Sequence, residues 1–114
     1  MAITGAHVLL YSSEPDALRS VMADVFDWTH VDAGGGWMIF ALPPAEIAVH
    51  PGEAPSHQLT LMCDDLDATL ADLRAKGIEV KGEPEDAGWG ITSILVLPGG
   101  VEVMIYQPRH TTAI

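Results

Sequence analysis

Four side chains in this sequence have the chemistry of metal ligands and lie in similar surroundings. His7 stands ahead of the apolar run VLLYS and His57 ahead of QLTLMC, while Glu46 and Glu102 lie in the later runs AEIAVH and VEVMIYQ. Two histidines and one carboxylate that converge on a point can hold a divalent metal such as Fe(II). Whether these side chains converge depends on the strands and helices that carry them.

The order of predicted elements occurs twice, which divides a single domain, residues 1–114, into two repeats of about 1–52 and 53–114. Short or alternating apolar runs predict strands, and apolar residues spaced by three and four predict helices. Each repeat reads as a strand, a helix and three strands. The ranges are 5–12, 12–28 and three strands within 29–50, followed by 57–63, 64–77, 78–82, 90–98 and 101–107.

Sequence signals mark the ends of the predicted helices. Ser12 or Ser13 is expected to cap the first helix and Asp64 or Asp65 the second, because their side-chain oxygens can accept a free backbone N–H. Gly77 is expected to end the second helix, since glycine tolerates the left-handed conformation found there. The triple glycine at 34–36 predicts a tight turn between two strands of the first repeat.

The two histidines that precede strands are out of register by one residue. Asp16 in the first helix matches Asp67 in the second, an offset of 51, so position 58 matches His7, and that position is Gln58. A slip of one residue turns a strand side chain to the opposite face of the sheet. His57 is therefore expected to point away from the face of His7 and Gln58, unless a bulge in the strand brings it back.

The closing strands of the two repeats give a second set of matched positions. With an offset of 56, Glu46 matches Glu102, Ala48 matches Met104, and His50 matches Tyr106. Alternation places these three positions of each strand on one face. The opening strands carry their own matched faces, which hold His7, Leu9 and Tyr11 in one repeat and Gln58, Thr60 and Met62 in the other.

Composition excludes some partners. The chain has 16 acidic and 5 basic residues and a net charge of −11, so it would repel nucleic acid and anionic membranes and would favour a cationic or neutral ligand. Cys63 is the only cysteine, which rules out an internal disulfide, and Asp64 and Asp65 beside it disfavour a nucleophilic thiolate. The sequence shows no signal peptide or membrane span, so a cytoplasmic location is expected.

The repeated layout resembles the vicinal oxygen chelate superfamily, which includes glyoxalase I, extradiol dioxygenases, and fosfomycin- and bleomycin-resistance proteins. The stretches that carry the resemblance are AHVLLYSSEPDALRSVMADVFDW, CDDLDATLADLRAKGIEV and LPGGVEVMIYQP. The resemblance implies an α+β fold in which tandem βαβββ modules form a curved mixed sheet, or cup, with the helices packed on the outside. It also implies a homodimer, with the cup built within one chain or across two.

The resemblance places metal ligands at His7, Ala48, Gln58 and Met104, and two of these positions are apolar. Ala48 offers no donor, and the thioether of Met104 suits Cu(I) rather than Mn, Ni, Zn or Fe(II). No cofactor is therefore expected. In the alternative, His7, Glu102 and either His57 or Gln58 would hold a divalent metal in a lyase or an extradiol-type dioxygenase.

The leading hypothesis is a metal-free binding protein that sequesters a bulky or cationic organic ligand, such as an antibiotic. Trp37, Trp89 and Tyr106 would grip the ligand, and Glu46 or Glu102 would pair with its charge. A purely structural or regulatory dimer is a third possibility. The residues expected at the ligand are His7, Tyr11, Trp37, Glu46, His50, Gln58, Met62, Trp89, Glu102, Met104 and Tyr106.

Overall fold

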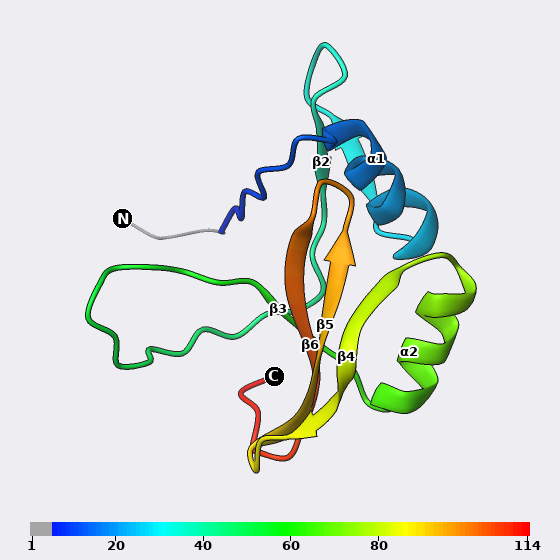
Figure 1. The fold of residues 1–114 in the computed structure, drawn as a ribbon. Helices are drawn as coiled ribbons and strands as arrows, with labels where there is room; N and C mark the ends of the chain where they lie inside the picture. Colours follow the sequence, from blue (N-terminus) through cyan, green and yellow to red (C-terminus); the bar gives the residue numbers. More distant parts are fainter. Residues whose placement is uncertain (1–5) are drawn as a thin grey trace.

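The structure is a computed structural model that describes residues 6–114, and it confirms the mixed α+β class (Figure 1). Its strands form two sheets, one with two strands and one with four. The elements in chain order are α1 (Pro15–Ser20), the π-helical turn η1 (Val21–Val25), β1 (His30–Asp32), β2 (Met38–Phe40), β3 (Thr60–Met62), α2 (Leu66–Ala75), β4 (Glu79–Asp86), β5 (Gly90–Leu97) and β6 (Val101–Pro108).

The second repeat forms the complete βαβββ unit that the sequence predicts. Its four strands lie in the order β3-β6-β5-β4, with β3 parallel to β6 and the other pairs antiparallel. Helix α2 connects β3 to β4 and covers one face of this sheet. The opposite face of the sheet has no helix of its own (Figure 1).

Both end signals predicted for α2 are confirmed. Asp65 is the N-cap, and its side chain accepts the backbone N–H of Ala68 at 3.0 Å. Such a cap stabilises a helix by about 1 kcal/mol. Gly77 follows the helix with a φ of 86°, a conformation in which a side chain would be strained.

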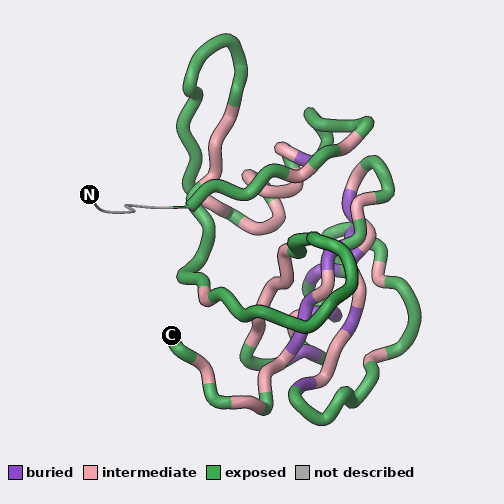
Figure 2. Tube along the Cα trace, turned by 90° about the vertical axis from the view of Figure 1, so that its left-hand side faces the viewer, coloured by how far each residue is buried: buried purple, intermediate pink, exposed green. Residues whose placement is uncertain are grey.

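The hydrophobic core lies between α2 and its sheet. Leu66 and Leu70 are almost completely buried, as is Leu95 on β5. Each such side chain contributes about 1.5–3 kcal/mol on burial. Figure 2 shows that the buried residues gather in this half of the molecule, whereas the N-terminal half is mostly exposed or half-buried.

The first repeat keeps its helix and a hairpin. β1 and β2 pair antiparallel, with His30 opposite Phe40, and the turn between them holds Gly34, Gly35 and Gly36, all with positive φ. The predicted triple-glycine turn is confirmed. None of the helices within residues 6–114 is long and apolar enough to cross a bilayer.

Two strands predicted in the first repeat are wrong for this chain. Residues 6–12 and 44–50 have strand-like sequences, but the structure gives them no ladder partner; residue 5 of the first predicted strand lies outside the described residues. A strand is stable only when its N–H and C=O groups pair with a neighbouring strand. Of the three strands predicted within 29–50, β1 and β2 are therefore the two that form.

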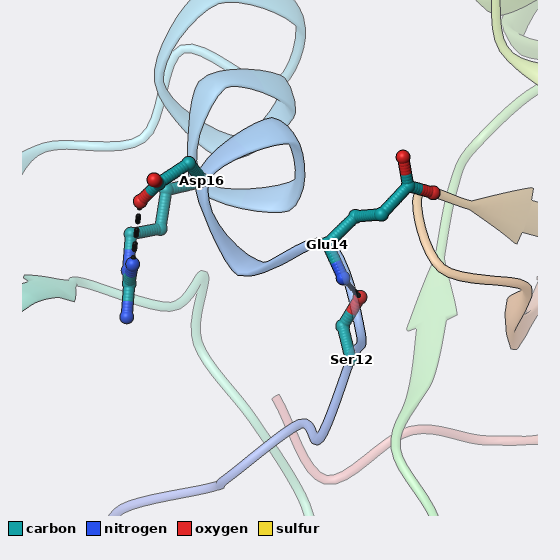
Figure 3. A network of polar contacts seen from close by, with 4 residues as sticks. Ser12, Glu14 and Asp16 are labelled. Carbon is teal, nitrogen blue, oxygen red and sulfur yellow. Dashed lines mark hydrogen bonds and ion pairs between the residues drawn. The ribbon is translucent and has the colours of Figure 1, made fainter.

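The predicted serine cap of the first helix is also wrong. Glu14 is the N-cap of α1 and makes no side-chain cap bond, because its carboxylate is turned toward the turn between β5 and β6. Ser12 instead joins the two halves of the chain, because its hydroxyl accepts the Glu14 N–H at 3.0 Å and donates to the Pro98 carbonyl at 2.7 Å. The Gly99 N–H donates to the Glu14 carboxylate at 2.8 Å. Figure 3 shows the Glu14 side chain extending away from the N-terminal end of α1.

Candidate functional site

The helix-free face of the four-stranded sheet is the candidate site, and we call it the open face. Pairing in register places Thr60 opposite Met104 and Met62 opposite Tyr106. The core residues Leu95, Val103 and Ile105 point to α2, so the alternate positions must point the other way. The open face includes Thr60, Met62, Thr92, Ile94, Met104 and Tyr106, and Val96 and Glu102 continue it toward the turn between β5 and β6.

This arrangement confirms the two matched faces that the sequence predicts for the second repeat. Gln58 precedes β3 and its amide donates to the hydroxyl of Thr60 at 3.2 Å, so it borders the open face. Ile94 lies opposite Met104 on the other side of β6. The centre of the open face is therefore built from flexible thioethers and an aliphatic side chain, which can adapt to a large apolar surface.

One end of the open face carries an aromatic cluster. The ring of Trp89 meets the ring of Tyr106 edge-on, with centroids 5.2 Å apart, and the ring of His110 stacks on Tyr106 at 5.8 Å. His110 Nδ1 lies 2.9 Å from the Thr111 carbonyl and must donate to it, which leaves Nε2 to accept the Tyr106 hydroxyl at 2.9 Å. His110 was not among the residues predicted from the sequence. Its position two residues after β6, the strand that carries Tyr106, could have indicated that it lies near that ring.

The turn between β4 and β5 holds Trp89 in place. The Arg109 N–H donates to the Trp89 carbonyl at 2.9 Å, and the Arg109 guanidinium donates to Asp86 at 2.6 Å. This guanidinium lowers the pKa of the Asp86 carboxyl, and the Gly88 N–H adds to the effect. A Cβ at Gly90 would lie 2.8 Å from the Tyr106 ring, so glycine lets that ring pack close to the turn.

Two carboxylates predicted at the site are in different electrostatic situations. Glu102 pairs with Lys81 at 3.1 Å across the sheet, so its charge is already balanced within the chain. Glu46 accepts the Ala113 N–H at 2.7 Å and has no cationic partner among the described residues. Burial raises the pKa of Tyr106, and the nearby negative charge of Glu46 raises it further.

Cys63, which follows β3, is unsuited to nucleophilic chemistry. Burial raises the pKa of its thiol, and the charges of Asp64 and Asp65 raise it further, while a hydrogen bond with Thr69 acts in the opposite direction. The sulfur lies 3.6 Å from the Tyr106 carbonyl. The thiol therefore stays protonated near neutral pH, and the charge effect that the sequence predicted is present but second to burial.

Other predicted site residues are not brought to the open face within one chain. His7 and Tyr11 lie in the exposed segment 6–12, and His50 makes a local contact with the Pro51 carbonyl at 2.7 Å. Trp37 lies beside the hairpin turn, where the Arg19 guanidinium sits 5.7 Å from its ring. The structure thus gathers Gln58, Met62, Trp89, Glu102, Met104 and Tyr106 around one sheet and leaves His7, Tyr11, Trp37 and His50 apart from it.

The residues present do not fit a hard divalent metal. Met104 occupies the centre of the open face between Thr60 and Ile94, which supply one hydroxyl and no charge. His57 is exposed and precedes β3, and Glu102 is engaged with Lys81. Within residues 6–114 of one chain, no three His, Cys, Asp or Glu side chains lie close enough together to hold a metal ion.

Solved structures with the same fold include proteins of different activity. An antibiotic binding protein, TnmS3 from Streptomyces sp. CB03234, has a TM-score of 0.67 and 23% identity, covering 95% of this chain and 98% of that one. A lactoylglutathione lyase from Agrobacterium tumefaciens has a TM-score of 0.66 and 17% identity, covering 94% and 95%. The fosfomycin resistance protein FosX from Listeria monocytogenes has a TM-score of 0.57 and 15% identity, covering 97% and 94%.

At these identities the structural matches establish the fold alone. No curated protein sequence matches the chain significantly. The family model described as the Glyoxalase/Bleomycin resistance protein/Dioxygenase superfamily matches residues 5–105, which is most of the sequence. The chain therefore belongs to the glyoxalase, bleomycin resistance protein and dioxygenase superfamily.

Proposed function

We propose that this chain is a metal-free binding protein that sequesters a bulky, cationic organic ligand, such as an antibiotic, on its open face. The observation that carries the proposal is that Met62 and Met104 lie on the same helix-free face of one sheet as the Trp89–Tyr106 cluster. Flat or polycyclic ligands stack on aromatic rings, and thioethers adapt to irregular apolar shapes.

Charge supports a cationic ligand. The net charge of −11 attracts cations over long range. At the site itself, Glu46 is the better candidate to pair with the ligand, because Glu102 already has Lys81 as its partner. This assignment refines the prediction in which either carboxylate could serve.

The comparisons support the same class of function. The antibiotic binding protein from Streptomyces shares the fold, and so do a lyase and a resistance protein. We favour binding over the metal-dependent lyase or dioxygenase because Ala48 and Met104 stand where the resemblance calls for metal ligands. The proposal includes a homodimer and a cytoplasmic location, where a lone thiol such as Cys63 remains reduced.

Isothermal titration calorimetry with cationic glycopeptide and intercalator-type antibiotics tests the proposal. Trp89→Ala should weaken binding about tenfold, a typical loss for an aromatic anchor that the bound ligand covers. Trp37→Ala is the matched control, since the two indoles are 47% and 48% exposed and only Trp89 contacts Tyr106. The control should bind as the wild type does.

Metal analysis of protein purified without chelators tests the competing hypothesis, a metal-dependent enzyme. Failure to bind any compound of the panel, together with near-stoichiometric metal and turnover of a small substrate, would replace this proposal with the enzyme hypothesis. Equal losses in Trp89→Ala and Trp37→Ala would show that the ligand does not lie on the open face.

A further inference from the structure

Tyr106 is buried although it lies on a sheet face that no helix covers. Among the side chains named for the open face, it is the only buried one, with 8% of its surface exposed. Its ring packs against Gly90 and meets Trp89 edge-on, and the His110 ring stacks on it with centroids 5.8 Å apart. A flat ligand that stacks on Tyr106 must therefore displace one of these neighbours.

The chain holds these neighbours with different firmness. The Trp89 carbonyl accepts the Arg109 N–H at 2.9 Å, and the Arg109 side chain forms an ion pair with the end of β4. His110 follows this anchor and begins the terminal segment 110–114. Chain ends that are held by few contacts open at low cost in free energy. His110 is therefore the neighbour of Tyr106 that a ligand can displace.

The terminal segment also engages the carboxylate that is proposed to pair with the ligand. The Ala113 N–H donates to Glu46 at 2.7 Å, and the Tyr106 hydroxyl donates to His110 at 2.9 Å. Within residues 6–114, these are the two hydrogen bonds that join the segment 110–114 to the rest of the chain. The segment thus presents a flat ring to one group of the site and an N–H donor to the other.

We propose that residues 110–114 form an autoinhibitory strap, which covers Tyr106 and engages Glu46 in the free protein and leaves when a planar cationic ligand binds. Figure 1 shows the C-terminal segment turning back on the side of the sheet opposite to α2. The ring of the ligand takes the place of the His110 imidazole, and its ammonium takes the place of the Ala113 N–H. A charged donor binds a carboxylate more strongly than an amide N–H does, so the exchange favours a cation.

This inference rests on the proposed function and adds an internal competitor for the same site. A ligand binds only to molecules whose strap is open, so the apparent affinity falls in proportion to that open fraction. The strap is attached at two places, the His110 ring and the Ala113 N–H, and loss of either should raise the affinity about tenfold. The strap also makes the site selective, because a compound without a ring or without a positive charge replaces only one attachment.

The first test of the strap needs no ligand. N-acetylimidazole acetylates accessible tyrosine hydroxyls, and the chain has two tyrosines, of which Tyr11 is 85% exposed. Peptide mass spectrometry should show that Tyr106 reacts more slowly than Tyr11 in the wild type and several times faster in His110→Ala. His30→Ala is the matched control, because its ring packs on Phe40 in the β1–β2 hairpin, with centroids 5.1 Å apart. It should leave the rate at Tyr106 unchanged.

The second test measures displacement with daunorubicin, an intercalator-type antibiotic with a planar ring system and an ammonium group. In calorimetry, His110→Ala and Ala113→Pro, which removes the N–H that Glu46 accepts, should each bind it about tenfold more tightly than the wild type. His30→Ala should bind as the wild type does. In the wild type, saturating daunorubicin should speed the hydrogen exchange of the Ala113 amide, because the strap has left the site.

Equal acetylation of Tyr106 in the wild type and His110→Ala would overturn the strap, and so would strap variants that bind daunorubicin no more tightly. Slower exchange at Ala113 in the complex would also overturn it, because the segment would then close over the ligand. If His110→Ala does not fold, the exchange at Ala113 in the wild type decides. Binding of other antibiotics of the panel but not of daunorubicin would sink the strap alone. No binding by any form would sink the proposed function as well.

Discussion

Replacing Gly99 with alanine tests how the two repeats are joined. Gly99 lies in the turn between β5 and β6 with a φ of 85°, and its N–H donates to Glu14 at 2.8 Å. A Cβ at this position would run into the hydroxyl of Ser12 and would lie 3.1 Å from the Ser13 backbone nitrogen. Gly99→Ala should therefore push the segment 12–14 away from the turn.

The expected cost has two parts. An alanine with positive φ costs about 1 kcal/mol relative to glycine. Displacement of the segment also loses the hydrogen bonds of Ser12 to Pro98 and of Gly99 to Glu14, each of which contributes about 0.5–1.5 kcal/mol. The free energy of unfolding should fall by about 3 kcal/mol in total.

The neighbouring glycine separates the two parts. Gly100 has a φ of 74°, but a Cβ there would meet nothing within 4 Å, so Gly100→Ala should lose only the conformational part, about 1 kcal/mol. Urea unfolding followed by circular dichroism measures both variants. Equal losses in the two variants would refute the docking of residues 12–14 on this turn.

Three further changes test other parts of the structure. Asp65→Ala should lower the free energy of unfolding by about 1 kcal/mol through loss of the Ala68 cap, while Asp64→Ala, the neighbouring control, should have little effect in the same urea titration. Burial raises the pKa of Cys63, so its thiol should react with iodoacetamide at pH 8 more slowly than free cysteine; reaction at the rate of free cysteine would contradict the buried position. Burial likewise raises the pKa of Tyr106 above its ordinary value of 10.0, so the stability it contributes is fully present below that pH and is lost as the pH rises through the folded value. Tyr106→Phe should reduce this alkaline loss, and an unchanged pH profile of unfolding would count against the buried phenol.

The second repeat was predictable because its signals are local. The Asp65 cap, the leucine spacing and Gly77 all lie within one stretch and define α2 without tertiary information. The face of β3 and β6 followed from alternation, and the pairing of Thr60 with Met104 confirms it. Here local preference and long-range packing agree.

The sequence did not predict the state of the first repeat or the neighbours of the site. Residues 6–12 and 44–50 have the pattern of strands, but whether a strand forms depends on a neighbour that no local pattern specifies. The strand order brings Lys81 to Glu102, and the course of the chain after β6 brings His110 to Tyr106. Long-range contacts of this kind cannot be inferred from spacing along the chain.

The unequal burial of the two repeats bears directly on function. Of the buried hydrophobic residues within 6–114, only Leu18 belongs to the first repeat, and the remainder lie from Leu66 to Tyr106. The second repeat thus supplies most of the core, and the first repeat packs against it through Leu18 and half-buried side chains such as Val21 and Phe26. A unit with so little core of its own gains its stability from the surface on which it packs, since apolar burial provides most of the stability of a folded unit. The position of the first repeat, and of His7 and Tyr11 within it, therefore depends on its junction with the second repeat, which the bonds of Ser12 to Pro98 and of Glu14 to Gly99 form.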